Sequence, residues 1–132
     1  MNSNEILELA KQLGEALSGS DQFLRYKAAD DAYHADEEAL RLTEEYGKKT
    51  QELSLELSKE DITPSEMIKI RQKMTAEYAS LCLNPVIKEF VESKGAAEQL
   101  LGEVNSIIQF YVTGEEQQGG CSGNCGSCGG CH

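Results

Sequence analysis

The residues best suited to chemistry in this 132-residue chain are four cysteines close to its C-terminal end. Cys121, Cys125, Cys128 and Cys131 follow the spacing C-x3-C-x2-C-x2-C within 11 residues, and His132 comes directly after them. The surrounding segment has no apolar side chain whose burial could order it, and ordering costs about 1–2 kcal/mol per residue of backbone. A structural metal contributes roughly 10–16 kcal/mol in zinc-binding peptides, so a bound metal can supply the missing stabilisation.

Three interpretations of these cysteines are open. A disulfide framework fits poorly, because the cysteine count of 5 is odd and the chain shows no sign of an oxidising compartment. Zinc held by four thiolates is chemically reasonable, although structural zinc sites usually use two Cys-x2-Cys pairs separated by a longer loop. An iron–sulfur cluster with four cysteinate ligands fits compact spacing of this kind. We therefore expect an iron–sulfur cluster, of the 4Fe–4S type, with zinc as the alternative.

The other reactive side chains have ordinary structural interpretations. Cys82 lies between two leucines in an expected helix, where a cysteine is usually a small buried apolar residue. His34 lies at a helix end near Asp30 and Asp36, which favours a solvated or ion-paired imidazole over a catalytic one. His132 is either an additional ligand or solvated. Since no nucleophile–base pair and no phosphate loop is recognisable, the sequence gives no support for a self-sufficient enzyme.

The charge of the chain restricts its partners. Lys and Arg number 12 against 23 Asp and Glu, for a formal net charge of −11. Such an acidic chain is a poor candidate for direct contact with nucleic acid or with anionic membrane surfaces. No apolar run approaches the roughly 20 residues of a membrane span, and the first residues lack the basic start of a secretory signal. We therefore expect a soluble, cytoplasmic protein.

The elements that must position the cysteines fall into two parts. Residues 114–132 hold seven of the 12 glycines and four of the 5 cysteines, without any Lys, Arg, aliphatic or aromatic residue. Residues 1–113 hold every large apolar side chain, at spacings of three and four. The sequence predicts an all-α domain over 1–113, an antiparallel bundle of about four to five helices, followed by a flexible metal-binding tail over 114–132.

The predicted helix ends depend on capping residues. Asn2 with Glu5 predicts a capping box, and Asp21 is expected to cap a second helix that runs to about His34. Asp36 is expected to cap the third helix. The fourth and fifth are expected to begin at Thr63-Pro64-Ser65-Glu66, another capping box, and at Asn84-Pro85, and Gly114 to close the fifth. Glu-before-basic pairs at i, i+4 are predicted on the third helix: Glu37–Arg41, Glu44–Lys48 and Glu45–Lys49.

Two helices carry longer apolar stripes than one small bundle buries. The last helix repeats apolar positions every three or four residues from Ile87 to Tyr111, and the third helix is long. Such a face fits a bundle core or a subunit interface, and we expect a homodimer or a hetero-oligomer.

A family resemblance extends over roughly residues 3–113. It rests on the order and spacing of five segments: Ile6-Leu7…Ala10…Leu13-Gly14, Ser20-Asp21-Gln22-Phe23-Leu24-Arg25-Tyr26-Lys27-Ala28, Asp36-Glu37-Glu38-Ala39, Leu83-Asn84-Pro85-Val86-Ile87-Lys88-Glu89-Phe90 and Leu100-Leu101-Gly102-Glu103-Val104-Asn105-Ser106-Ile107-Ile108. In these the chain resembles the YlbF/YmcA family of bacterial regulators.

The resemblance implies a function as well as an all-α fold. Members of that family associate with one another and with YaaT, in a complex that carries iron–sulfur clusters and acts with ribonuclease Y in mRNA processing. The cysteine tail is similar to that of YlbF-type members, which again implies Cys121, Cys125, Cys128 and Cys131 as ligands. The expectation is a non-enzymatic regulator or adaptor that affects competence, sporulation and biofilm formation, with YmcA-like and YaaT-like partners. The alternatives are an electron-transfer or cluster-delivery module and a zinc-stabilised structural interaction protein.

Overall fold

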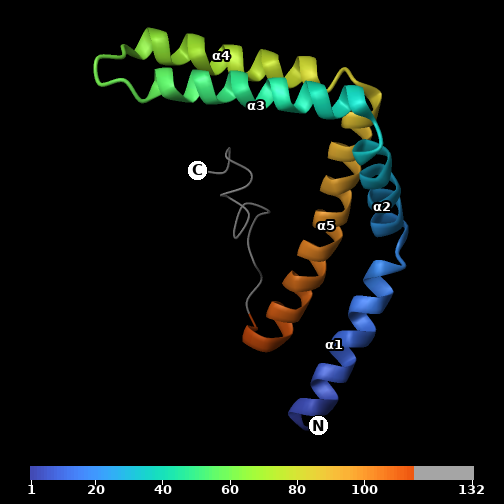
Figure 1. Ribbon diagram of the computed structural model, residues 1–132. Coiled ribbons are helices and arrows are strands. Elements are labelled where there is room, and N and C mark those ends of the chain that lie inside the picture. The colour runs from blue at the N-terminus through green and yellow to red at the C-terminus, as the bar shows by residue number, and fades with distance from the viewer. Residues whose placement is uncertain (115–132) are drawn as a thin grey trace.

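Five helices make up the regular structure of the part of the chain described by the computed structural model, residues 1–114 (Figure 1). In chain order they are α1 (Ser3–Ser18), α2 (Asp21–His34), α3 (Glu37–Leu57), α4 (Pro64–Leu81) and α5 (Pro85–Thr113). Residues 1–114 contain no strand. The prediction of an all-α fold is confirmed.

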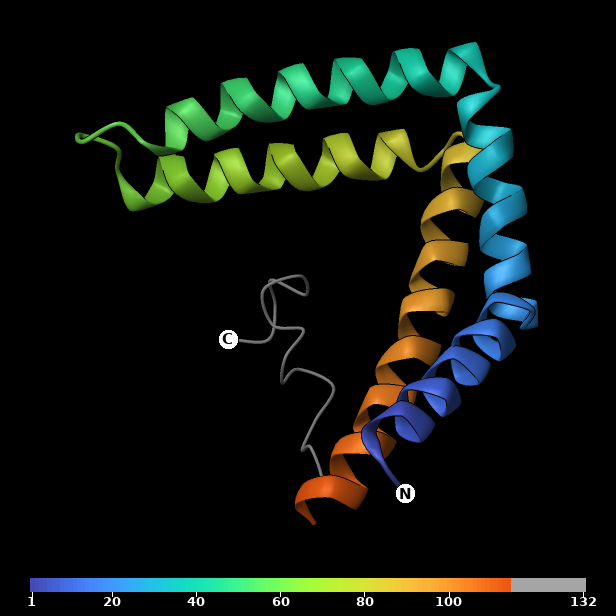
Figure 2. The same ribbon diagram turned by 60° about the horizontal axis from the view of Figure 1, so that its bottom comes forward.

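The helices form two arms that meet at an angle, and each arm is built on a pair of antiparallel helices (Figures 1 and 2). The long α5 packs against α2, while α3 and α4 form a hairpin that projects from the end of that pair. The first helix, α1, continues beyond α2 along the arm that contains α5. The antiparallel pairing that the sequence predicted is therefore realised twice, in two-helix layers that leave large helix faces uncovered.

The helix ends follow the predicted capping residues, except that Ser20 takes the place of Asp21 and that only the Thr63 half of the capping box predicted at Thr63 and Glu66 is formed. The Asn2 side chain and the Glu5 side chain form the reciprocal capping box, and Gly114 closes α5 in the left-handed conformation at φ 77°. Asp36, Thr63 and Asn84 cap α3, α4 and α5. The assignment of Asp21 as a cap is wrong: the Ser20 hydroxyl accepts the backbone N–H of Phe23 at 3.3 Å. Asp21 is instead the first residue of α2, where its carboxylate interacts favourably with the helix dipole.

The densest packing lies between α2 and α5. Ala29 of α2 is buried with Ile87, Ser93 and Ala97 of α5, and the Ser93 hydroxyl donates to the Phe90 carbonyl at 3.1 Å. These small residues let the two helices approach closely. The first half of α5 therefore packs on α2 through a small buried core, in which the buried hydroxyl of Ser93 is hydrogen-bonded.

The α3–α4 hairpin is held by fewer buried groups. Ile70 of α4 is 6% exposed, and the rings of Tyr46 and Tyr78 lie 6.1 Å apart across the hairpin. Lys49 pairs with Glu77 of α4 at 3.3 Å, where the sequence predicted a partner on its own helix. Because an exposed ion pair of this kind contributes less than about 1 kcal/mol, apolar contact determines most of the hairpin's stability.

Candidate protein-interaction surface

The first helix is almost without tertiary cover. None of its 16 residues is buried, and four of its large apolar side chains, Ile6, Leu7, Leu9 and Leu13, are exposed. Leu7 is 60% exposed, and even Leu13 is 38% exposed. The spacing of Ile6, Ala10, Leu13 and Leu17 predicts one inward stripe, which leaves out Leu7 and Leu9. The signal was present, because apolar residues at 6, 7, 9 and 13 surround more of the helix than one stripe needs.

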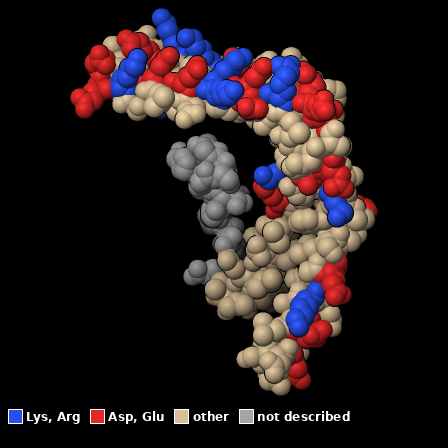
Figure 3. All heavy atoms as spheres, in the orientation of Figure 1, with Lys and Arg blue, Asp and Glu red and all other residues tan. Residues whose placement is uncertain are grey.

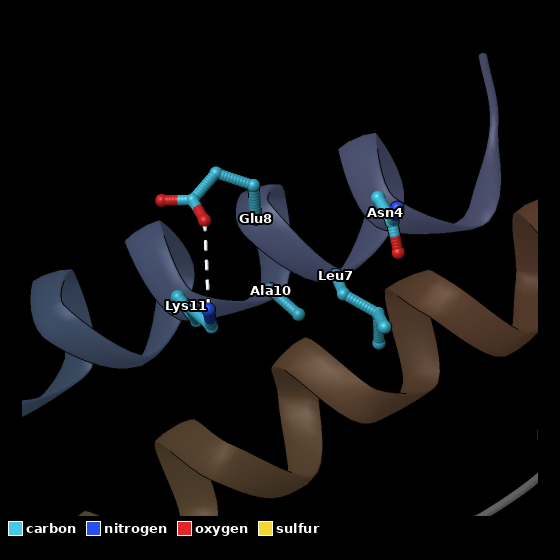
Figure 4. A pocket seen from close by; sticks show the side chains of 5 residues that line it. All are labelled: Asn4, Leu7, Glu8, Ala10 and Lys11. Carbon is cyan, nitrogen blue, oxygen red and sulfur yellow. Dashed lines mark ion pairs between the residues drawn. The ribbon is translucent and has the colours of Figure 1, made fainter.

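An open depression runs along α1 on the side that faces α5 (Figure 4). Asn4, Leu7, Glu8, Ala10 and Lys11 line it, and the side chains of Leu7 and Ala10 point toward α5. On the rim, the Lys11 ammonium lies 3.6 Å from the Glu8 carboxylate. An apolar floor with a charged rim is the usual composition of a protein–protein contact.

The C-terminal half of α5 presents a second uncovered apolar face. Tyr111 is 82% exposed and Ile107 59% exposed, whereas Ile87 at the start of the same helix is 2% exposed. Uncharged residues dominate the C-terminal end of α5, whereas charged residues line the α3–α4 hairpin (Figure 3). Between residues 99 and 113 the only charged residue is Glu103.

Together these side chains form one candidate surface, which we call the α1–α5 apolar surface. It consists of ten residues that are between 38% and 82% exposed: Ile6, Leu7, Leu9, Leu13, Leu101, Ile107, Ile108, Phe110, Tyr111 and Val112. Monomeric proteins rarely leave a large apolar patch in water unless it binds another molecule, so the exposure of these ten side chains makes the two helices a candidate binding surface.

The predicted metal ligands lie outside the described residues. Cys121, Cys125, Cys128 and Cys131 belong to the segment 115–132. Within residues 1–114, no group of three or more His, Cys, Asp or Glu side chains could hold a metal ion. The four-cysteine site therefore remains a prediction from the sequence.

Cys82 and His34 have the environments of structural residues. Cys82 is a free thiol that caps the C-terminus of α4, and it is half-buried where the sequence predicted a buried side chain. Burial, followed by a hydrogen bond with Cys82, raises the pKa of Tyr78 above its ordinary value. His34 Nδ1 lies 3.3 Å from an Asp30 carboxylate oxygen, in agreement with the predicted ion-paired role.

Two arginines, Arg25 and Arg41, each form ion pairs with glutamates of the helices. Arg25 of α2 makes a bidentate pair with Glu89 of α5 at 2.7 and 2.8 Å, and this hydrogen bonding lowers the pKa of Glu89. Arg41 pairs with Glu38 and Glu45 on α3, where the sequence predicted Glu37, and the hydrogen bond lowers the pKa of Glu38. Both arginines reinforce helix geometry and lie apart from the α1–α5 apolar surface.

Residues 1–114 form an all-α fold that leaves apolar side chains of α1 and α5 uncovered. Residues 6–113 match the family described as YlbF/YmcA, control of the competence regulator ComK. The chain belongs to this family, which confirms the resemblance noted in the sequence. No helix in residues 1–114 is both long enough and apolar enough to span a bilayer.

Individual relatives and one solved structure agree with this assignment. A UPF0342 protein of Caldicellulosiruptor saccharolyticus is 29% identical over 108 residues, which are 81% of this chain and 87% of the relative. The UPF0342 protein YheA of Bacillus subtilis is 29% identical over 104 residues, covering 76% of this chain and 84% of YheA. The crystal structure of Bacillus subtilis RicA in complex with RicF superposes with a TM-score of 0.70 at 23% identity, covering 85% of this chain and 96% of that one. This last likeness establishes a shared fold.

Proposed function

We propose that this chain is a non-enzymatic regulatory adaptor that acts by binding helical proteins of its own family. The family description as a control of a competence regulator supports a regulatory role. The finer proposal, which rests on the family resemblance, is a complex with YmcA-like and YaaT-like proteins that acts with ribonuclease Y in mRNA processing.

The α1–α5 apolar surface carries this proposal. Leu7 on α1 is 60% exposed, and Tyr111 at the C-terminal end of α5, where no residue after Ala97 is buried, is 82% exposed. Burial of apolar surface contributes about 25 cal/mol per Å², so covering both segments with a partner makes the free energy of association more favourable. The fold neighbour RicA was solved in complex with RicF, which supports association as the way this fold is used.

The cysteine tail adds a metal site to the proposed adaptor. Cys121, Cys125, Cys128 and Cys131 supply four thiolates, the donor set of an iron–sulfur cluster and also of structural zinc. The tail follows Gly114, directly after the exposed end of α5. A cluster held there would lie close in sequence to the surface on which partners bind, which allows partner binding to respond to cluster occupancy.

Site-specific photo-crosslinking in the source organism tests the association. A benzophenone amino acid at position 111 is compared with the same group at position 83, because Tyr111 and Leu83 are both 82% exposed. The proposal predicts that position 111 captures a YlbF/YmcA-family chain, either this one or a relative, and that position 83 does not. Equal capture from both positions, or no family chain from position 111, would contradict it.

Anaerobic purification of the full chain tests the metal. A broad absorption band near 400 nm with bound iron and sulfide supports the iron–sulfur proposal. A colourless protein that contains stoichiometric zinc would replace it with the structural zinc alternative. Reversible reduction without any partner would favour electron transfer over regulation.

A further inference from the structure

We infer that α4 carries a second docking surface, which takes an acidic amphipathic helix of another protein. This surface, which we call the α4 basic face, consists of six exposed residues: Ile68, Lys69, Arg71, Gln72, Lys73 and Thr75. It lies on the hairpin arm, whereas α1 lies along the other arm (Figures 1 and 2). The inference goes beyond the proposed function, because it concerns a different surface and a different partner.

The charge of α4 differs from that of the other helices in residues 1–114. Pro64–Leu81 holds three cations against two acids, Glu66 and Glu77, whereas each of the other four helices has more acids than cations. All three cations lie within residues 67–76, which contain no Asp or Glu. In a chain with a net charge of −11, this helix is therefore the one that attracts an acidic partner.

The cations of α4 are also available to a partner. All three are exposed, and none of them makes an ion pair with the described residues. By contrast, Lys49 of the adjacent α3 pairs with Glu77 at 3.3 Å. Lys69 and Lys73 are four residues apart, a spacing at which like charges on a helix repel one another. An acidic group between these two lysines would relieve that repulsion.

An apolar strip runs between the cations. With 3.6 residues per turn, Ile68, Gln72 and Thr75 lie on one side of α4, between the arginine on one flank and the two lysines on the other. These three residues and Arg71 line an open depression, and Ile68 is 58% exposed. The Thr75 hydroxyl donates to the Arg71 carbonyl at 3.0 Å, so its hydrogen-bonding requirement is met within the helix. The complement of such a strip is a helix with an apolar stripe between acidic residues.

A helical peptide fits this surface better than a nucleic acid does. Nucleic-acid affinity comes mostly from cations that neutralise phosphates, and three cations neutralise few of them. The neighbouring α3 holds six acids against three cations, and it would repel a polyanion that extended beyond α4. The exposed isoleucine gains instead from contact with an apolar side chain of the partner.

Titration of the isotope-labelled full chain with synthetic probes, followed by amide NMR shifts, tests the inference. The main probe is an acetylated and amidated peptide of about 20 residues, a length that supports a helix. It carries leucine at every third or fourth position and glutamate on both sides of that stripe. A second peptide has serine in place of every leucine, and a single-stranded oligouridylate supplies phosphate charge without an apolar stripe.

A pair of double variants with the same change in net charge locates the binding. Lys69→Gln with Arg71→Gln removes two cations of the α4 basic face. Lys27→Gln with Lys59→Gln is the control, because both lysines are exposed and make no ion pair with the described residues. Circular dichroism checks that each variant keeps its helices.

We expect the leucine–glutamate peptide to shift the amides of residues 67–76, and the α4 double variant to bind it roughly tenfold more weakly. Ile68→Ser should also weaken binding, whereas Leu55→Ser should bind as the native chain does, although Ile68 and Leu55 are 58% and 63% exposed. No shift at millimolar peptide, shifts confined to other helices, or equal weakening by the two double variants would overturn the inference. Tighter binding of the serine peptide or of the oligouridylate to the same amides would overturn it too.

Discussion

Tyr33 of α2 stacks on Phe90 of α5, with ring centroids 4.7 Å apart and ring planes 16° from parallel. Tyr26, nearly two turns earlier on α2, lies against the same phenylalanine at 5.8 Å. Phe90 of α5 thus contacts α2 at two positions, Tyr26 and Tyr33. Because Phe90 contacts both tyrosine rings, we expect this aromatic cluster to contribute substantially to the stability of the α2–α5 pair.

Replacing Phe90 with alanine should therefore destabilise the chain strongly. Full burial of a phenylalanine is worth about 3–5 kcal/mol on truncation, and Phe90 is half-buried, so we expect a loss of about 2 kcal/mol. Urea unfolding followed by circular dichroism measures the change. Leu83→Ala, at a position 82% exposed, should alter the unfolding free energy by less than about 0.5 kcal/mol. Equal effects of the two substitutions would show that the α2–α5 contact is not the stabilising core.

The Arg25–Glu89 pair predicts a pH dependence. Hydrogen bonds from Arg25 lower the folded-state pKa of Glu89, so folding favours its ionised form. The stabilisation is therefore present above the unfolded-state pKa and is lost as the pH falls through the lowered folded-state pKa. Glu89→Gln should reduce the midpoint of thermal unfolding slightly at neutral pH and should have no effect at a pH where Glu89 is protonated in the folded chain.

Glu56→Gln provides the control for that measurement, because Glu56 makes no ion pair with the described residues. The midpoint of Glu56→Gln should follow that of the native chain at every pH. If Glu89→Gln and the native chain differ by the same amount at low and neutral pH, the ion pair is not the source of the difference.

The sequence predicted the helices well because their limits are set locally. Proline at the first helical position and an Asn, Asp or Thr cap act within one turn, and Thr63, Asn84 and Gly114 mark the ends that the structure shows. Ser20 competed with Asp21 for one cap, and both residue types accept the same amide, so the sequence did not separate them.

The sequence could not predict which faces would be covered. Ile87 and Ile108 occupy equivalent stripe positions on one helix, yet the first is 2% and the second 46% exposed. Periodicity indicates only that a face is apolar. Because α2 is shorter than α5, it covers the part of α5 that contains Ile87 and leaves the part that contains Ile108 exposed. Tyr78 illustrates the same limit: it lies at helical spacing from Ile70 and Met74 on α4, yet it is 43% exposed, because a two-helix hairpin covers only one side of each stripe.

A glycine inside α3 offers a stability gain. Gly47 lies in the middle of the helix, and a Cβ built on it would meet no atom within 4 Å. Alanine is better than glycine in a helix interior by about 0.5–1 kcal/mol, so Gly47→Ala should stabilise the chain by that amount. Denaturant unfolding measures it. A loss of stability would mean that another chain approaches α3 at this position.

Iron binding and partner binding should strengthen each other if the tail regulates association. Cys125→Ser combined with Cys128→Ser should abolish iron binding and weaken association with a family partner, since coupling between two sites is reciprocal. Cys82→Ser should change stability at most, because Cys82 caps α4. Partner affinity is measured anaerobically by titration calorimetry with iron-loaded chain. Unchanged affinity in the double variant would show that the cluster does not control association.

The claim that α1 and the end of α5 form the interface is tested most directly by hydrogen–deuterium exchange of the full chain over a dilution series. At high concentration, or with a bound family partner, amides of α1 and of residues 101–113 should exchange slowly. On dilution, and in Ile107→Lys, both segments should exchange faster while the segment around Ile87 and Ser93 stays protected. Fast exchange of α1 at every concentration and with every partner would contradict the account.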